Sequence, residues 1–147
     1  MIVNCNTSST SKRSLSGSTP PPPGIVITPA MFVAPTNTGI NMTVLVNAGA
    51  ALNTPYAGGE LGAFYDLNGD GNLQCVALST VAVGPFSLAI WGDNGATPIK
   101  DGLDPGDVPY FAVLDGGIVY LFTPSPAFSG YVDNGIAVIT NGSSSPL

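Results

Sequence analysis

The sequence predicts an all-β fold, an Ig-like or jelly-roll-type antiparallel β-sandwich of about seven strands with an extended N-terminal arm. Three observations support this prediction: short apolar runs alternate with turn residues from residue 25 onward, no window keeps a 3.6-residue apolar period, and 14 prolines leave few places for a helix. The chain has 147 residues, 44% of them hydrophobic, so we expect one domain with one modest core.

Residues 1–24 are predicted to form an arm that precedes the domain at residues 25–147. The arm is rich in Ser and Thr, contains Cys5, and ends in four prolines before Gly24. Consecutive prolines favour a stiff polyproline II spacer, here of roughly 12 Å. Because the arm has little to bury, we expect it to become ordered by lying on neighbouring subunits or on its own domain. The four prolines are Pro20, Pro21, Pro22 and Pro23.

Seven strands are predicted where short apolar runs lie between turn signals. A shorter run at residues 25–27 is a candidate edge strand. Asp115-Gly116-Gly117 predicts a tight hairpin, because glycine tolerates the positive φ of primed turns, and Asp133-Asn134-Gly135 predicts a similar turn before the last strand. The predicted strands are residues 40–46, 60–65, 73–78, 86–91, 108–114, 118–122 and 136–140.

The composition excludes several classes of function. Without histidine, the chain cannot form a Ser-His-Asp triad, a Cys-His pair or a His-containing zinc site. Beyond Lys12 and Arg13 in the arm, Lys100 is the one basic residue against nine acidic ones, so we expect no binding to nucleic acid. No apolar run reaches the ~18 residues of a membrane span. Residues 1–20 lack a signal-peptide pattern, so export by that route is not expected if Met1 is the native start.

Asp66, Asn68 and Asp70 reproduce the first half of a calcium-binding loop, D-x-N-x-D-G. The twelfth position should carry a bidentate Glu, and here it is Ala77. The alternative, which we favour, is a hairpin turn built from residues that tolerate its dihedral angles. We therefore expect no cofactor, with Ca²⁺ at these three residues as the alternative.

The loop at residues 92–107 carries four further carboxylates. They could complete a cation site, but we favour a pairing of Lys100 with an adjacent Asp while the other carboxylates remain solvated. Seven of the nine acidic residues lie in or beside turns, where carboxylates usually support backbone geometry, so we expect no glycosidase pair and no enzyme. The four carboxylates of the loop belong to Asp93, Asp101, Asp104 and Asp107.

Cysteines and aromatic residues leave alternatives open. Cys5 and Cys75 could form a disulfide within or between chains, although we favour a buried Cys75 and a free Cys5. Residues 109–114 are apolar on both faces, which predicts a strand covered by the second sheet and by a partner. A core or interface role is therefore favoured over a sugar-stacking platform for the aromatic residues Phe64, Tyr65, Trp91, Phe111, Tyr120 and Phe122.

Residues 60–107 resemble a β-sandwich module with the pattern IGAF…CVG…AIWGDD…TP-KDGF…GE. The matching residues are Glu60-Leu61-Gly62-Ala63-Phe64, Cys75-Val76-Ala77, Ala89-Ile90-Trp91-Gly92-Asp93, Thr97-Pro98, Lys100-Asp101-Gly102 and Gly106-Asp107. This chain departs from the pattern at Asn94, Ile99 and Leu103, which stand where Asp, Glu and Phe are usual. The module recurs in structural proteins of marine tailed phages, especially cyanophages, and in secreted bacterial surface proteins.

The resemblance implies an extracellular structural or adhesive role and no catalytic residue. Since a virion leaves its host by lysis and its proteins need no export signal, we expect a subunit at the virion surface, of the capsid-decoration or fibre type. Its expected partners are copies of itself or other virion neighbours, contacted through the arm. The alternative is a subunit or adhesion module of a bacterial extracellular filament, which binds calcium or a host-surface glycan.

Overall fold

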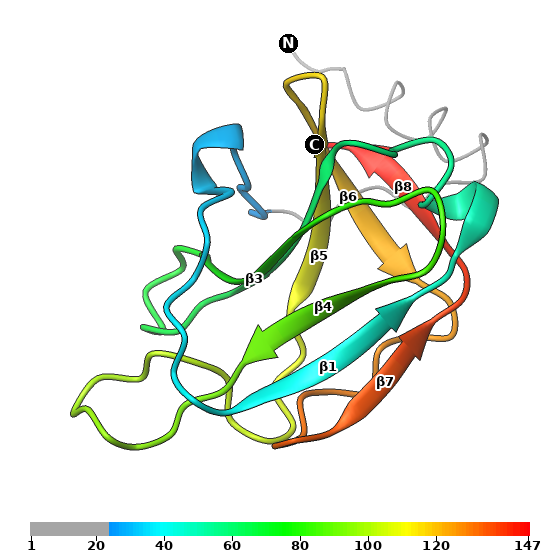
Figure 1. Cartoon of the computed structure of the whole chain (residues 1–147). Coiled ribbons are helices and arrows are strands. Elements are labelled where there is room, and N and C mark those ends of the chain that lie inside the picture. Colours follow the sequence, from blue (N-terminus) through cyan, green and yellow to red (C-terminus); the bar gives the residue numbers. More distant parts are fainter. Residues whose placement is uncertain (1–23) are drawn as a thin grey trace, which may run out of the picture.

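The computed structural model describes residues 24–147, which form eight strands in two packed sheets. Both sheets and their connections are visible in Figure 1. Two short 3₁₀ turns, η1 (Pro29–Met31) and η2 (Gly49–Ala51), are the helical elements of this part of the chain. The small sheet has three strands in the order β4 (Phe86–Trp91), β1 (Asn41–Val46) and β7 (Ile136–Ile139). The large sheet has five strands in the order β3 (Gln74–Thr80), β2 (Glu60–Tyr65), β5 (Tyr110–Asp115), β6 (Ile118–Pro124) and β8 (Gly142–Pro146).

The predicted β-sandwich is confirmed, and all seven predicted strands are present within two residues of their expected ends. Two features differ from the expectation. An eighth strand, β8, pairs with β6, and β7 pairs with β1 in parallel while every other strand pair is antiparallel. The chain passes from one sheet to the other five times, and the passages from β3 to β4 and from β7 to β8 each link an edge strand of one sheet to an edge strand of the other.

The main core lies between the two sheets, because alternate residues of each strand point inward. In β1, for example, Met42, Val44 and Val46 are buried while Leu45 is exposed. Larger side chains meet them from the large sheet and from the loops. The bulky core residues of the large sheet and the loops are Leu52, Leu61, Leu103, Phe111, Phe122 and Tyr131.

A second core lies on the outer face of the large sheet. Residues 25–33, which we name the cover segment, run over this face, and Ile27 and Phe32 are buried there against Phe64, Ala112 and Val119. The rings of Phe32 and Phe64 meet edge to face with centroids 4.9 Å apart. The expectation that β5 is covered on both faces is therefore correct, but the described cover is the chain's own segment.

The candidate edge strand at residues 25–27 is wrong. These residues form no strand. Their apolar side chains instead contribute to the packing on the sheet face, where Ile27 is buried and Ile25 is half-buried. A three-residue apolar run is compatible both with an edge strand and with an irregular segment packed on a sheet face, because the hydrophobic effect is non-directional.

The turn predictions hold where glycine or asparagine takes a positive φ. Gly116 and Gly117 have φ of 58° and 80° and join β5 to β6 in a tight hairpin. Asn134 has φ of 55°, and the N–H of Gly135 donates to the carbonyl of Val132, which closes a turn before β7. This turn precedes the next-to-last strand, because β8 follows β7.

Candidate functional site

The loop between β2 and β3 contains the half calcium motif, and its carboxylates hold the turn together. Asp66 Oδ1 accepts the N–H groups of Gly69 at 2.7 Å and Asp70 at 3.1 Å, and Oδ2 accepts that of Gly71 at 2.8 Å. The Gly71 bond is the largest of the contributions that lower the pKa of Asp66. Asp70 Oδ1 in turn accepts the N–H of Asn72 at 2.9 Å.

These contacts match the turn interpretation of the loop. Within residues 24–147, no three Cys, Asp or Glu side chains are grouped to hold a metal. Calcium binding by Asp66, Asn68 and Asp70 stays a prediction, and it would require Asp66 to exchange backbone donors for the cation.

Lys100 lies at the centre of a charged network in the loop after β4. Its Nζ lies 2.7 Å from Asp107 Oδ2, 2.9 Å from Asp104 Oδ2 and 5.2 Å from the centre of the Tyr65 ring. Asp107 Oδ1 accepts the Tyr65 hydroxyl at 2.9 Å, and Oδ2 accepts the N–H of Asp104 at 2.9 Å. The expected pairing of Lys100 is present, but its partners lie four and seven residues ahead and do not include Asp101.

The network shifts the pKa values of its members. Burial acts to lower the pKa of Lys100, but the hydrogen bonds to Asp107 and Asp104 outweigh it and raise the pKa to about 12. Burial acts to raise the pKa of Asp107, but the Lys100 ammonium and the N–H of Asp104 leave it below its ordinary value. The hydrogen bond to Asp107 raises the pKa of Tyr65. Each shift favours the charge state that holds the loop against β2 at neutral pH.

Residues 91–103 close this loop through their backbone. The N–H of Leu103 donates to the carbonyl of Trp91 at 3.0 Å, and the N–H of Asp93 donates to the carbonyl of Leu103 at 2.9 Å. A Cβ on Gly92 would overlap the hydroxyl of Tyr131, and a Cβ on Gly102 would overlap the backbone of Gly92. The two motif glycines are therefore explained by close packing.

The other motif residues mostly serve the loop itself. Asp93 accepts the N–H of Gly95 at 3.3 Å, and Asp101 accepts the Thr97 hydroxyl at 3.3 Å. Asn94, one of the departures from the pattern, donates through Nδ2 to the carbonyl of Thr38, a bond that an ionised aspartate could not donate. The structure brings Trp91, Gly92, Asp93 and Gly102 together around this closure, but it does not bring the loop carboxylates to Asp66, Asn68 or Asp70 as one cation site.

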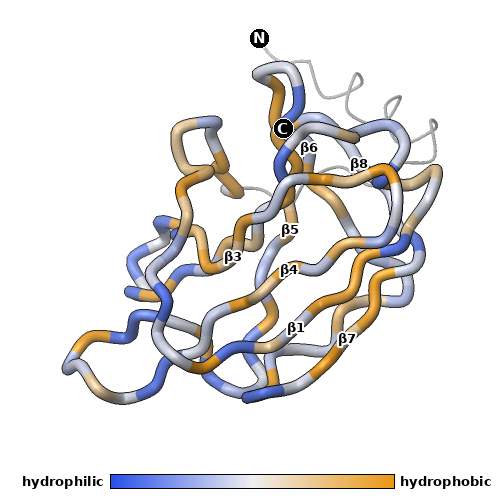
Figure 2. The backbone as a smooth tube through the Cα atoms, viewed as in Figure 1, coloured by the Kyte–Doolittle hydropathy of each residue, from blue (hydrophilic) through white to orange (hydrophobic). Residues whose placement is uncertain are grey.

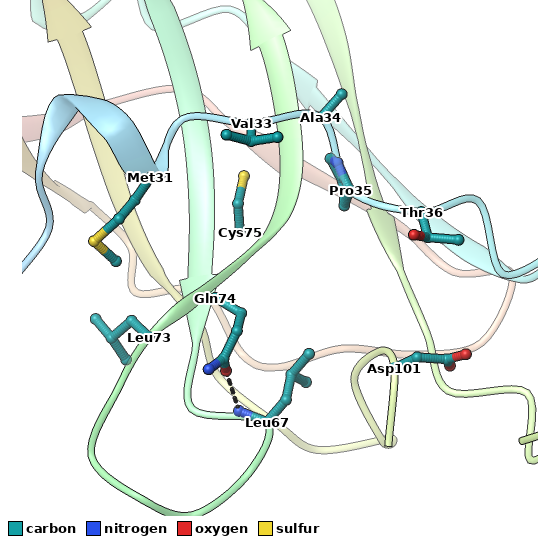
Figure 3. Close-up of a pocket in the computed structure, with 10 residues that line it drawn as sticks. All are labelled: Met31, Val33, Ala34, Pro35, Thr36, Leu67, Leu73, Gln74, Cys75 and Asp101. Carbon is teal, nitrogen blue, oxygen red and sulfur yellow. Dashed lines mark hydrogen bonds between the residues drawn. The ribbon is translucent and has the colours of Figure 1, made fainter. Parts of the chain in front are cut away.

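A pocket of about 400 Å³ opens between the chain at residues 31–36 and the start of β3. Figure 3 shows Cys75 beneath Val33 and the Gln74 side chain accepting the N–H of Leu67 at 2.8 Å. Sequence reasoning missed this pocket, because residues 31–36 carry no recognisable pattern. The residues that line it are Met31, Val33, Ala34, Pro35, Thr36, Leu67, Leu73, Gln74, Cys75 and Asp101.

Cys75 is a free cysteine of the described chain, and it is half-buried where the sequence favoured a buried position. Its Sγ donates to the carbonyl of Ala77 at 3.1 Å, and burial raises the pKa of the thiol. A raised pKa keeps the sulfur protonated and unreactive at neutral pH. Cys5 and the four prolines Pro20 to Pro23 lie outside the described residues.

Five of the six aromatic residues considered as a sugar-stacking platform lie in or against the two cores. Phe64 is buried under the cover segment, and Phe111 and Phe122 are buried between the sheets. A second, largely apolar cavity of about 300 Å³ lies at the ends of β5 and β6. Trp91 is half-buried at the end of β4, on the outward side of its strand.

The outer face of the small sheet combines exposed apolar side chains from adjacent strands with an absence of charge. Its outward side chains, which we name the open face, come from alternate positions of β1, β4 and β7, and none of these three strands carries a charged residue. Leu45, Ile136 and Val138 are 45%, 74% and 55% exposed. Apolar residues follow one another along β1 and β7 (Figure 2). The open face consists of Asn41, Thr43, Leu45, Ser87, Ala89, Trp91, Ile136 and Val138.

The chain matches no protein-family model, no curated protein and no solved structure. No helix among residues 24–147 is long and apolar enough to cross a membrane. The open face and the charged network around Lys100 are therefore interpreted from their own chemistry.

Proposed function

We propose that this protein is a non-enzymatic structural subunit of a virion, of the capsid-decoration or fibre type. The N-terminal arm at residues 1–24 attaches it to its neighbours, and the β-sandwich is displayed at the virion surface. The resemblance of residues 60–107 to a module of phage structural proteins and bacterial surface proteins supports this proposal.

The observation that carries the proposal is the open face. The described body has one basic residue, Lys100, and all nine acidic residues, so its copies repel one another at most orientations. The three strands beneath the open face carry no charge, and apolar side chains protrude from them. A surface of this kind favours docking, since burying it costs no ionic desolvation.

The carboxylates of the body are used in a way that fits a structural role. Asp66 organises the turn between β2 and β3, and Asp107 binds Lys100 and Tyr65 in the loop after β4. Each of them stabilises a connection at the same end of the sandwich (Figure 1).

The test is deletion of residues 1–24 from the chain in its native particle. We expect the truncated chain to fold, because both described cores are built from residues 25 onward, and to be lost from the particle. Circular dichroism and thermal unfolding measure the fold, and mass spectrometry of purified particles measures incorporation. Incorporation equal to that of the full chain would contradict the proposal. Calcium-dependent glycan binding that is lost in Asp66→Ala or Asp70→Ala would favour the bacterial adhesion module instead.

A further inference from the structure

We propose that the open face and the free edge of β7 receive the N-terminal arm of a second copy of this chain. This inference rests on the proposed function and names the acceptor surface for the arm. Subunits connected in this way form a head-to-tail series, because the arm of one copy and the open face of the next are different surfaces.

One edge of β7 is open for pairing in the described chain. Within residues 24–147, β7 has β1 as its one partner strand, so the backbone groups on its other edge have no strand to pair with. Sheet edges are usually protected by lysine, proline, bulges or a covering segment. The sequence of β7, Ile-Ala-Val-Ile, contains no charge and no proline, and its register with β1 shows no bulge. Such an edge can accept an added strand from an extended peptide.

The described chain begins on the side of the sandwich opposite the open face. The 23 residues that precede Gly24 could extend over roughly 75 Å at about 3.3 Å per residue. The chain leaves the described body beside Ile25, which packs on the outer face of the large sheet. The open face belongs to the other sheet, on the opposite side of the sandwich. An arm that begins at the outer face of the large sheet of one copy can therefore reach the open face of the next copy.

The arm and the small sheet are complementary in charge and hydropathy. The arm carries Lys12 and Arg13 and no acidic residue, whereas the body is strongly acidic. Asp93 follows β4 and Asp133 precedes β7, and the pairing of both strands with the start of β1 places these residues at one end of the small sheet. The arm also begins with three apolar residues, Met1 to Val3, which can pack on the exposed side chains of β7.

The direct test is photo-crosslinking of the full chain. A benzophenone amino acid replaces Val138 on the open face or, in the matched control, Val83 in the connection between β3 and β4, where the side chain is 72% exposed. ¹⁴N-labelled and ¹⁵N-labelled chains are mixed at the highest soluble concentration before irradiation. We expect position 138 to link to a peptide within residues 1–23 of the other isotopic copy, and position 83 to give no such link. Links from position 138 to the arm of the same copy, to the body of another copy, or to nothing would overturn the inference.

A second measurement separates this inference from the proposed function. Val138→Lys places a charge on the open face, and Val83→Lys is its control. We expect Val138→Lys to weaken self-association by about tenfold or more without lowering the thermal unfolding temperature, because an interface must desolvate the new ammonium. If deletion of residues 1–24 abolishes association but Val138→Lys does not, the acceptor surface is wrong and the role of the arm stands. If neither change weakens association, both proposals fail.

Discussion

The two sheets of this sandwich differ in how they treat their outer faces. On the large sheet, Phe64 faces outward and is fully buried, because Phe32 and the rest of the cover segment lie over it. On the small sheet, Ile136 and Val138 also face outward, and they are exposed. Apolar residues on an outer strand face thus do not by themselves indicate a partner: on one sheet the chain supplies its own cover, and on the other it leaves a surface suited to docking.

The strongest way to test this comparison is to truncate one side chain on each face. Phe64→Ala should lower the free energy of unfolding by about 3–5 kcal/mol, because it leaves a cavity between the large sheet and the cover segment. Leu45→Ala on the open face should change it by less than about 1 kcal/mol, because the side chain is 45% exposed. Urea denaturation followed by tryptophan fluorescence measures both values. Equal losses in the two variants would show that the faces are packed alike.

A smaller effect is expected from Phe32→Ala, which weakens the cover while leaving the sheet intact. We expect a loss of about 2–3 kcal/mol, below the usual range of about 3–5 kcal/mol for phenylalanine truncations, because Phe32 is 9% exposed and Phe64 is fully buried. The same change should expose Cys75, which lies beneath Val33 (Figure 3). In a Cys5→Ser background, the thiol should react about tenfold faster with a disulfide reagent than in the parent chain. An unchanged reaction rate would mean that the cover segment does not protect the large sheet.

The charged loop after β4 should contribute less than either apolar cluster. Asp107 has a lowered pKa, so its stabilising effect is present above the ordinary carboxyl value of about 4 and is lost as pH falls through the lowered one. Lys100 has a raised pKa, so its contribution is complete below its ordinary value and is lost as pH rises through about 12. Asp107→Asn should therefore cost about 1 kcal/mol at pH 7 and flatten the fall in stability below pH of about 4. Thermal unfolding from pH 3 to 8 measures this, and parallel curves for variant and parent would contradict it.

The smallest effect is expected for calcium. Because Asp66 already accepts three backbone N–H groups, adding millimolar Ca²⁺ should shift the midpoint of thermal unfolding by less than about 1 °C. A matched measurement on Asp70→Asn serves as the control. If Ca²⁺ raised the midpoint of thermal unfolding by several degrees in the parent chain but not in the variant, this expectation would be wrong and the loop would be a calcium site.

Strand positions were predictable because apolar runs and turn residues are local signals. β8 was not predictable, because Gly142–Pro146 consists of Gly, Ser and Pro, without an apolar period, and gains its place from pairing with β6. The parallel pairing of β1 with β7 was also not predictable, because it depends on the tertiary packing of segments that lie far apart in the sequence.

The candidate site was predictable only in part, for the same reason. The pairing of Lys100 was foreseen, but its partners depend on the way the loop returns toward Tyr65. The open face could not be identified from alternation alone, because β5 shows a similar pattern and is covered by the cover segment. Only the described tertiary arrangement distinguishes the two.

Electron microscopy of the native particle that carries this chain, at a resolution that allows residues 1–24 to be traced, tests the proposed role of the arm directly. We expect the arm of each subunit to lie on the open face of a neighbour and along its β7 edge. Arms that lie on their own sandwich, with the open face in solvent in every copy, would contradict it.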